Sequence, residues 1–287
     1  TKKAFTDIEH TGVTTHFVIP YLAPLDAIKL AATMGRSAAA DTNYAFYETL
    51  TGFHFASIRK MIRDGHAKGD TMPVITMSLA GNSPIKMGPN ELRADAIDIV
   101  SGFDFLQQLS HGAFSSTTVG IDILSGKYQH TIATANDESF KNRMLVGGPS
   151  SVPAYPAALG TFNPTGKMFL VPTTSISASN TAMTALDSTI RDNFIETTIQ
   201  GRNRELLSLA SRCVRVRVTG APELQSGTLV RINVPLPLNN NTLVPAGKDI
   251  ASGVYLILSA KHELINMGDG NFVYETTFEA YSDSYSK

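Results

Sequence analysis

Six residues in the last third of the chain, CVRVRV at 213–218, alternate between apolar and charged side chains. This period of two is typical of a β-strand with one buried face and one wet face. The alternation returns at 229–234, 254–265 and 272–278, and the Asp269-Gly270 pair before the last run is typical of a hairpin turn. The pattern predicts a four-stranded antiparallel meander.

The wet face of this meander carries charges of both signs. Counting by two along the strands assigns to it Arg215, Arg217, Arg231, Asn233, Lys261, Glu263, Glu275, Thr277 and Glu279. An ordinary solvated sheet surface accounts for such a face. A second interpretation is that the face lines a passage shared between subunits, and the residues alone leave both interpretations open.

A hairpin and a helix are predicted upstream of the meander. Residues 113–140 alternate on both sides of Ser125-Gly126, which predicts a hairpin. Ser188 is a suitable N-cap for a helix whose apolar residues recur at helical spacing up to Ala210. The helix and the meander together make up residues 189–287.

The segment between the hairpin and the helix, residues 141–188, has an unusual composition. Its central part, residues 144–186, contains five prolines and a single charged residue. A disordered tether usually combines high charge with low hydrophobicity, whereas this segment keeps several aromatic residues. An irregular insertion that packs against another surface is therefore favoured over a tether, and its candidate interface residues are Tyr155, Phe162, Lys167 and Phe169.

The first 112 residues mix helical and strand patterns. A helix is predicted from Pro24 to Gly35, with proline in its first turn, and a strand at 44–50. Apolar residues recur at helical spacing around residues 55–62 and again at 91–111, where an amphipathic helix is predicted. Residues 1–112 are therefore predicted to form an α+β domain.

The composition excludes several classes of protein. A formal net charge of −1 gives no long-range field for general binding of nucleic acid or anionic membranes. Cys213 is the single cysteine, which excludes an intrachain disulfide and a cysteine-rich metal site. No apolar stretch approaches the roughly 20 residues of a membrane-spanning helix. The 287 residues predict about two domains, and the start at Thr1 leads us to expect a fragment or a processed product.

No catalytic motif appears in the sequence. We find no Gly-x-Ser-x-Gly elbow, no His-Glu-x-x-His helix and no phosphate-binding loop, and the seven histidines are scattered. Asp95 and Asp98, beside Glu91, are a carboxylate pair suited to acid–base chemistry or to a cation. A solvated helix face is the favoured interpretation of this pair. We therefore predict no enzymatic activity, no cofactor and no metal.

Several short motifs follow one another over nearly the whole chain. They are FVIPYxxP at 17–24, YxFYETxxGFxFxxI at 44–58, FDxL at 103–106, VxVxG at 216–220, SGxYLI at 252–257 and YxT at 274–276. Their order resembles that of the central baseplate hub proteins of contractile-tailed, T-even-type bacteriophages. The resemblance rests on the order of the motifs, since no single one is specific.

The resemblance implies a structural virion protein of the phage tail baseplate, assembled in the host cytoplasm. Such a hub is a homotrimer whose subunits each contribute two tube-type β-domains to a pseudo-sixfold ring. The ring joins the central spike protein to the tail tube protein, with baseplate wedge proteins as further partners, and DNA passes through it only in transit.

The chain departs from this family pattern in one respect. Only one tube-type antiparallel β-barrel domain is predicted, from residues 113–140 and 189–287, with the low-charge segment 141–188 inserted between its parts. Residues 1–112 match the α+β domain that follows the first tube-type domain in the family. The first tube-type domain is expected to lie upstream of Thr1, or the hub has a different symmetry.

Two other functions stay open. One is a spike-hub component of a related bacterial contractile injection or secretion system, which neighbouring genes for capsid and terminase proteins would argue against. The other is a β-rich extracellular hydrolase with a site drawn from Asp95, Asp98 and a histidine. Activity assays on peptidoglycan and glycosides would distinguish the hydrolase from a structural protein.

Overall fold

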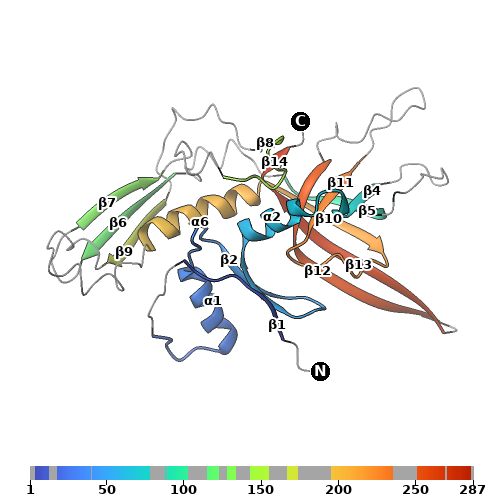
Figure 1. The fold of residues 1–287 in the computed structure, drawn as a ribbon, viewed down its shortest axis with the longest axis horizontal. Helices are drawn as coiled ribbons and strands as arrows, with labels where there is room; N and C mark the ends of the chain where they lie inside the picture. Colours follow the sequence, from blue (N-terminus) through green and yellow to red (C-terminus); the bar gives the residue numbers. More distant parts are fainter. Residues whose placement is uncertain are drawn as a thin grey trace.

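The structure is a computed structural model of mixed α+β content, with a closed six-stranded β-barrel and three α-helices among the residues it describes (Figure 1). Those residues are 4–12, 18–39, 41–77, 88, 90–102, 115–122, 128–133, 143–154, 167–173, 195–234, 251–268 and 270–285. None of the helices in these ranges is long and apolar enough to cross a membrane.

The barrel uses the four predicted C-terminal strands and two strands from earlier in the chain. Its order is β10 (Arg212–Thr219), β13 (Asn271–Ser282), β12 (Gly253–Gly268), β11 (Leu229–Asn233), β4 (Val74–Met77) and β5 (Glu91–Gly102). Strands β11, β4 and β5 are parallel neighbours and the other pairs are antiparallel. The predicted meander is wrong in one connection, because β10 pairs with β13 and β5 and not with β11.

Inward-facing side chains fill the barrel as the alternation predicts. Val214, Val216 and Val218 of β10 are at most 2% exposed, and Phe278 of the adjacent β13 and Tyr255 of β12 fill the interior beside them. Complete burial of a side chain of this size stabilises a fold by about 1.5–3 kcal/mol. The interior of the barrel is therefore the principal core of the protein.

Strand β5 corrects the prediction of a helix at 91–111. Its pairing with β10 shifts register twice, so that Ala94, Ile97 and Ile99 face Val218, Val216 and Val214. Each shift inserts an extra residue, as a β-bulge does. The β5 positions that contact the core, Leu92, Ala94 and Ile97, consequently follow steps of two and three, which imitate helical spacing in the sequence, whereas Ile99 is 66% exposed. Residues 103–111 lie outside the described residues.

The predicted hairpin at 113–140 forms, but it does not belong to the barrel. Its strands β6 (Ser116–Asp122) and β7 (Tyr128–Ala133) pair in antiparallel fashion, and β6 also pairs in parallel with β9 (Lys167–Thr173). These three strands form a separate sheet, which we call the distal sheet. The place in the barrel that was expected for the hairpin is taken by β4 and β5, which precede residue 112.

The low-charge insertion is less irregular than predicted. It contributes β9 to the distal sheet and β8 (Val152–Pro153), which pairs with β14 (Ser284–Tyr285) at the C-terminus. Of the candidate interface residues, Lys167 begins β9 and Phe169 is half-buried in it. Tyr155 and Phe162 lie outside the described residues.

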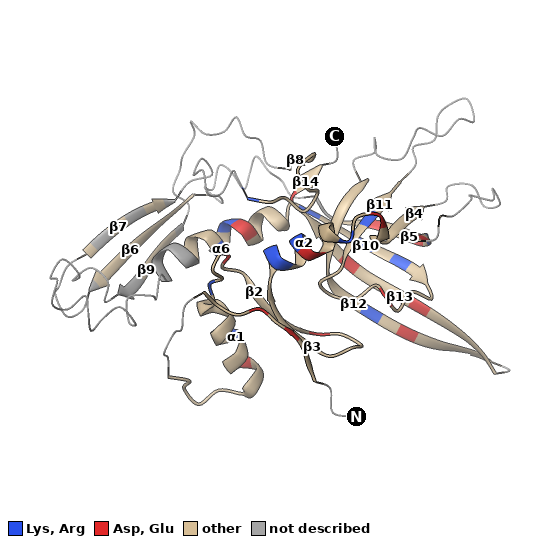
Figure 2. Ribbon diagram, viewed as in Figure 1, with Lys and Arg blue, Asp and Glu red and all other residues tan. Residues whose placement is uncertain are grey.

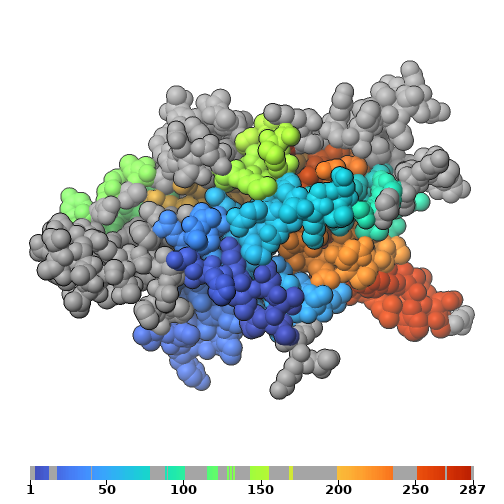
Figure 3. Space-filling model, viewed as in Figure 1, coloured from blue at the N-terminus to red at the C-terminus, as the bar shows by residue number. Residues whose placement is uncertain are grey.

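An N-terminal layer packs on the outside of the barrel. It contains β1 (Phe5–Ile8), β3 (Phe53–Ser57) and β2 (Tyr44–Glu48) in one sheet, with α1 (Pro24–Met34), α2 (Ile58–Ala67) and the short 3-10 helix η1 (Gly69–Thr71). Helix α2 starts where Ser57 accepts a hydrogen bond from the backbone of Lys60. Figure 3 shows this layer, in blue and cyan, against the orange barrel strands.

A second core joins this layer to the barrel. Met61 and Ile62 of α2 pack with Leu229 and Leu256, which point outward from β11 and β12. The contact between α2 and β11 is close, since a side chain at Gly65 would lie 2.5 Å from Leu229. One outer face of the barrel is thereby covered.

Helix α6 (Ile195–Leu209) connects the barrel with the distal sheet. It lies along the distal sheet at one end and reaches the barrel at the other (Figure 1). The helix predicted from Ser188 is thus confirmed over its described length.

Candidate functional site

The candidate site is the outer face of the barrel formed by β5, β10, β13 and β12. We call it the charged wall and define it by the outward charged side chains of these strands: Glu91, Arg93, Asp95, Asp98, Arg215, Arg217, Lys261, Glu263, Glu275 and Glu279. Figure 2 shows acidic and basic positions interspersed along β12 and β13. Four basic and six acidic residues give the wall a formal net charge of −2.

The strand register places opposite charges next to each other. Arg215 lies between Glu279 on β13 and Asp98 on β5. Its Nε and Nη2 donate to Oε1 of Glu279 at 3.1 and 2.6 Å. This hydrogen bond raises the pKa of the Arg215 guanidinium, so the group stays charged. Arg215 is therefore already neutralised within the wall.

The other strands of the wall continue the pairing. Arg217 Nε lies 3.6 Å from Glu275 Oε1, and Lys261 Nζ lies 2.7 Å from Glu263 Oε1. Such exposed ion pairs contribute only about 0–1 kcal/mol each to stability. These ion pairs matter more for the surface potential, because a basic side chain that is paired with a carboxylate attracts a polyanion only weakly.

Seven of the nine predicted face residues lie on this part of the barrel, and Thr277 is the uncharged one among them. Arg231 and Asn233 lie on β11, between β12 and β4, and not on the charged wall. The predicted face is thus divided between two sides of the barrel. The reason is that β11 is next to β12 in the barrel and is not a neighbour of β10.

The sequence reasoning did not assign the acidic residues of β5 to the wall. Asp95 and Asp98 are on β5, which was predicted as a helix. Thr219 Oγ1 donates to Asp95 Oδ2 at 2.8 Å, and Asp98 faces Arg215. Among the described residues no hydrogen bond or ion pair joins either aspartate to a histidine, and no cluster of metal-binding side chains occurs. Within the described part of the chain, Asp95 and Asp98 are therefore not combined with a histidine, and His16 and His111 lie outside it.

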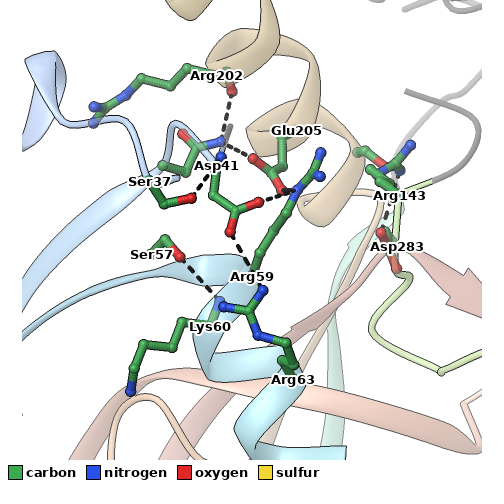
Figure 4. A network of polar contacts seen from close by, with 12 residues as sticks. Ser37, Asp41, Ser57, Arg59, Lys60, Arg63, Arg143, Arg202, Glu205 and Asp283 are labelled. Atoms are coloured by element: carbon green, nitrogen blue, oxygen red, sulfur yellow. Dashed lines mark hydrogen bonds and ion pairs between the residues drawn. The ribbon is translucent and has the colours of Figure 1, made fainter. Parts of the chain in front are cut away.

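A polar junction fixes α6 to the N-terminal layer (Figure 4). We define it as Asp41, Asn43, Arg59 and Glu205. Arg59 Nε lies 2.9 Å from Glu205 Oε1 and 3.4 Å from Asp41 Oδ1, and the Asn43 amide donates to Glu205. Burial raises the pKa of the Asp41 carboxyl although Arg59 opposes the shift. The junction thereby orients the helix that carries the distal sheet.

A second buried pair ties the C-terminus to the same helix. Arg143 Nη2 contacts Asp283 Oδ2 at 3.3 Å and Ser208 Oγ of α6 at 2.5 Å. Asp283 also accepts a hydrogen bond from the backbone of Val146 at 2.9 Å. Desolvation raises the pKa of Asp283, with Arg143 opposing the shift. Figure 4 shows this pair beside the polar junction.

A small cavity of about 200 Å³ lies between the β2–β3 turn and the barrel rim. Two of its polar lining residues, His262 and Thr49, are hydrogen-bonded to neighbouring side chains. His262 Nδ1 is 3.1 Å from Thr276 Oγ1 and 3.0 Å from the Tyr274 hydroxyl, and Thr49 Oγ1 is 2.9 Å from His54 Nε2. These contacts stabilise the rim.

No protein-family model matches the chain, and no curated protein matches it in sequence. The function is therefore argued from the barrel, the charged wall and the motif order in the sequence.

Proposed function

We propose that the protein is the structural hub of a phage tail baseplate, a homotrimeric ring that joins the central spike to the tail tube. The observation that carries the proposal is the charged wall, an open barrel face on which basic and acidic side chains neutralise each other. In the proposed ring, this wall faces the bore. The order of sequence motifs described above supports the same assignment.

The contrast between the two outer faces of the barrel supports this orientation. The face at β11 and β12 is apolar and covered by α2, with Leu229 and Leu256 at most 1% exposed. None of the described helices packs on the charged wall in this way, and Arg215 and Arg217 are each 52% exposed. A face that lines the bore of a ring must stay exposed to solvent. The charged wall meets this requirement, whereas the apolar face covered by α2 does not.

The charge pattern suits a route for DNA. A protein that neutralises phosphates with Lys and Arg gains a salt-dependent binding term for each phosphate. On the charged wall Arg215, Arg217 and Lys261 each contact a carboxylate of the wall. A bore lined in this way holds no row of unpaired cations that would retain DNA, and the polyanion is free to pass.

Mass photometry and negative-stain images of the purified protein test the proposal. A trimer that images as a ring with a central bore is the expected result. A species that stays monomeric at every concentration and in the presence of the spike protein contradicts it. Turnover on peptidoglycan or glycosides that is lost in Asp98→Asn would instead favour a hydrolase.

A further inference from the structure

The β12–β13 hairpin extends beyond the barrel as a two-stranded arm. Strand β11 pairs with β12 only over residues 253–256, and β10 pairs with β13 only as far as Glu275. Just beyond these points, backbone hydrogen bonds join Tyr274 to Gly220 and Ile257 to Gly227 and Thr228, and the strand pairing of β12 and β13 with each other continues up to Gly268 and Asn271. We call residues 264–268 and 270–274 the arm, which projects past the barrel in Figure 1.

The arm is apolar although it is exposed. Leu264 and Met267 are each 68% exposed and Phe272 is 59% exposed, and Ile265 and Val273 are more than a third exposed. An isolated two-stranded ribbon is only marginally stable in water. Exposed apolar residues grouped on such a ribbon indicate a surface that is covered in the assembled protein.

The distal sheet has an apolar face of its own. Its register places Ile121 opposite Tyr128, and Thr117 opposite both Ile132 and Met168, so these residues share one face with Leu170. Tyr128, Met168 and Leu170 are 76%, 71% and 64% exposed. The residues that the register assigns to this face include no Asp, Glu, Lys or Arg.

The other face of the distal sheet is occupied by α6. Ser116 and Thr118, which point to that side, are fully buried, and Gln200 of α6 donates to the backbone oxygen of Ser116 at 3.3 Å. The apolar face therefore lies on the side away from the helix and has no cover from it.

We propose that the arm of one copy seats on the apolar face of the distal sheet of the next copy. The two surfaces lie at opposite ends of the long axis of the molecule, so the arm does not reach its own distal sheet (Figure 1). A ring needs this kind of head-to-tail contact between two different surfaces. The inference rests on the proposed trimeric hub and names the contact that closes it.

A second copy is favoured over another protein because the chain itself supplies both halves of the contact. Each half is free of Asp, Glu, Lys and Arg among its described residues, as the centre of a stable interface usually is, and the sheet half also contains the exposed His130. The register places Leu264 and Phe272 on one face of the arm and Ile265 and Val273 on the other, so the Leu264–Phe272 face is the one that seats on the sheet.

Two double variants test the contact by mass photometry. The arm variant is Leu264→Asp with Phe272→Asp, and the sheet variant is Met168→Asp with Leu170→Asp. Each is expected to lose the trimer and remain a folded monomer. Mixing the two is expected to restore a dimer, because each variant keeps the surface that the other lacks. Arg217→Glu on the charged wall is the matched control and should remain trimeric.

Four results are distinguishable. A wild-type trimer that persists in either double variant overturns this inference and leaves the proposed hub standing. A wild-type monomer, alone and with the spike protein, overturns both. Trimers that persist in both double variants while spike binding is lost show that the spike occupies the distal sheet, which also overturns the inference. Loss of both trimers with recovery of a dimer on mixing supports it.

Disulfide trapping keeps the test decisive if the aspartate variants fold poorly. Phe272→Cys is mixed with Leu170→Cys under mild oxidation, in a chain whose only native cysteine, Cys213, is buried. A cross-linked dimer is expected from this mixture and not from Arg217→Cys mixed with Leu170→Cys. Absence of the cross-link in a protein that is trimeric overturns the inference.

Discussion

The barrel and the distal sheet are both built from strands with one apolar face, but they cover that face differently. In the barrel the sheet closes on itself, and Val216, Ile232 and Ile257 are fully buried. In the distal sheet α6 covers one face, while Tyr128 and Met168 on the other remain more than two-thirds exposed. Alternation in a sequence therefore identifies which side of a strand is apolar and says nothing about what covers it.

The largest expected effect comes from a charge placed in the barrel interior. Val216→Asp should lower the free energy of unfolding by about 3 kcal/mol or more, because the carboxylate would be buried without a partner. Soluble folded yield and the midpoint of chemical denaturation measure this. The matched change in the distal sheet, Leu170→Asp, should stay within about 0.5 kcal/mol. Equal losses in the two variants would remove the contrast between the regions.

Removal of Glu205 from the polar junction should let the distal sheet open independently of the barrel. Glu205→Ala leaves Arg59 and Asn43 without their shared partner and should cost about 2 kcal/mol. Because Glu205 is on α6, amide hydrogen exchange should accelerate in β6 and β7 and change little in β10. Exchange that accelerates uniformly would show that the distal sheet and the barrel open as one unit.

The same junction should give a pH dependence. Burial raises the pKa of Asp41 above its ordinary value of 3.8. A carboxyl with a raised folded-state pKa contributes stability below its unfolded pKa, and this contribution is lost as the pH rises through the folded-state pKa. Asp41→Asn removes the carboxyl that titrates. The difference in free energy of unfolding, wild type minus variant, should therefore fall as the pH is raised from acid toward neutrality. Denaturation curves at several pH values measure it, and a difference that rises with pH would contradict the burial.

The smallest effect on stability is expected on the charged wall. Arg217→Glu breaks an exposed pair 3.6 Å long, so its free energy of unfolding should change by no more than about 0.5 kcal/mol. A loss as large as that of Val216→Asp would show that Arg217 lies on the inner face of the barrel.

Reversing the charge of two wall residues should change DNA binding. Glu275→Lys with Glu279→Lys should create salt-dependent DNA binding that wild type lacks, measured by fluorescence anisotropy.

Much of the barrel was predictable, because its strands in the C-terminal third follow local rules. The inward valines of β10 and the hairpin between β12 and β13 were predicted from alternation and turn residues. Strand β5 was not, because its bulges break the period of two. Strand β9 was hidden by prolines, and Pro172 is tolerated there because β9 is an edge strand of its sheet.

The charged wall was predictable only in part, because strand β5 was not predicted. The basic and acidic residues of β10, β12 and β13 were identified by counting, whereas Asp95 and Asp98 became visible only when β5 was placed beside β10. The polar junction left no local pattern at all. Arg59 and Glu205 are 146 positions apart, and each alone resembles an ordinary surface charge.

A three-dimensional reconstruction of the purified assembly tests the central claim most directly. The account predicts a trimeric ring in which β5, β10, β13 and β12 present the charged wall to the bore. A monomer, or a ring that turns this wall toward the outside and lines its bore with other strands, would contradict it.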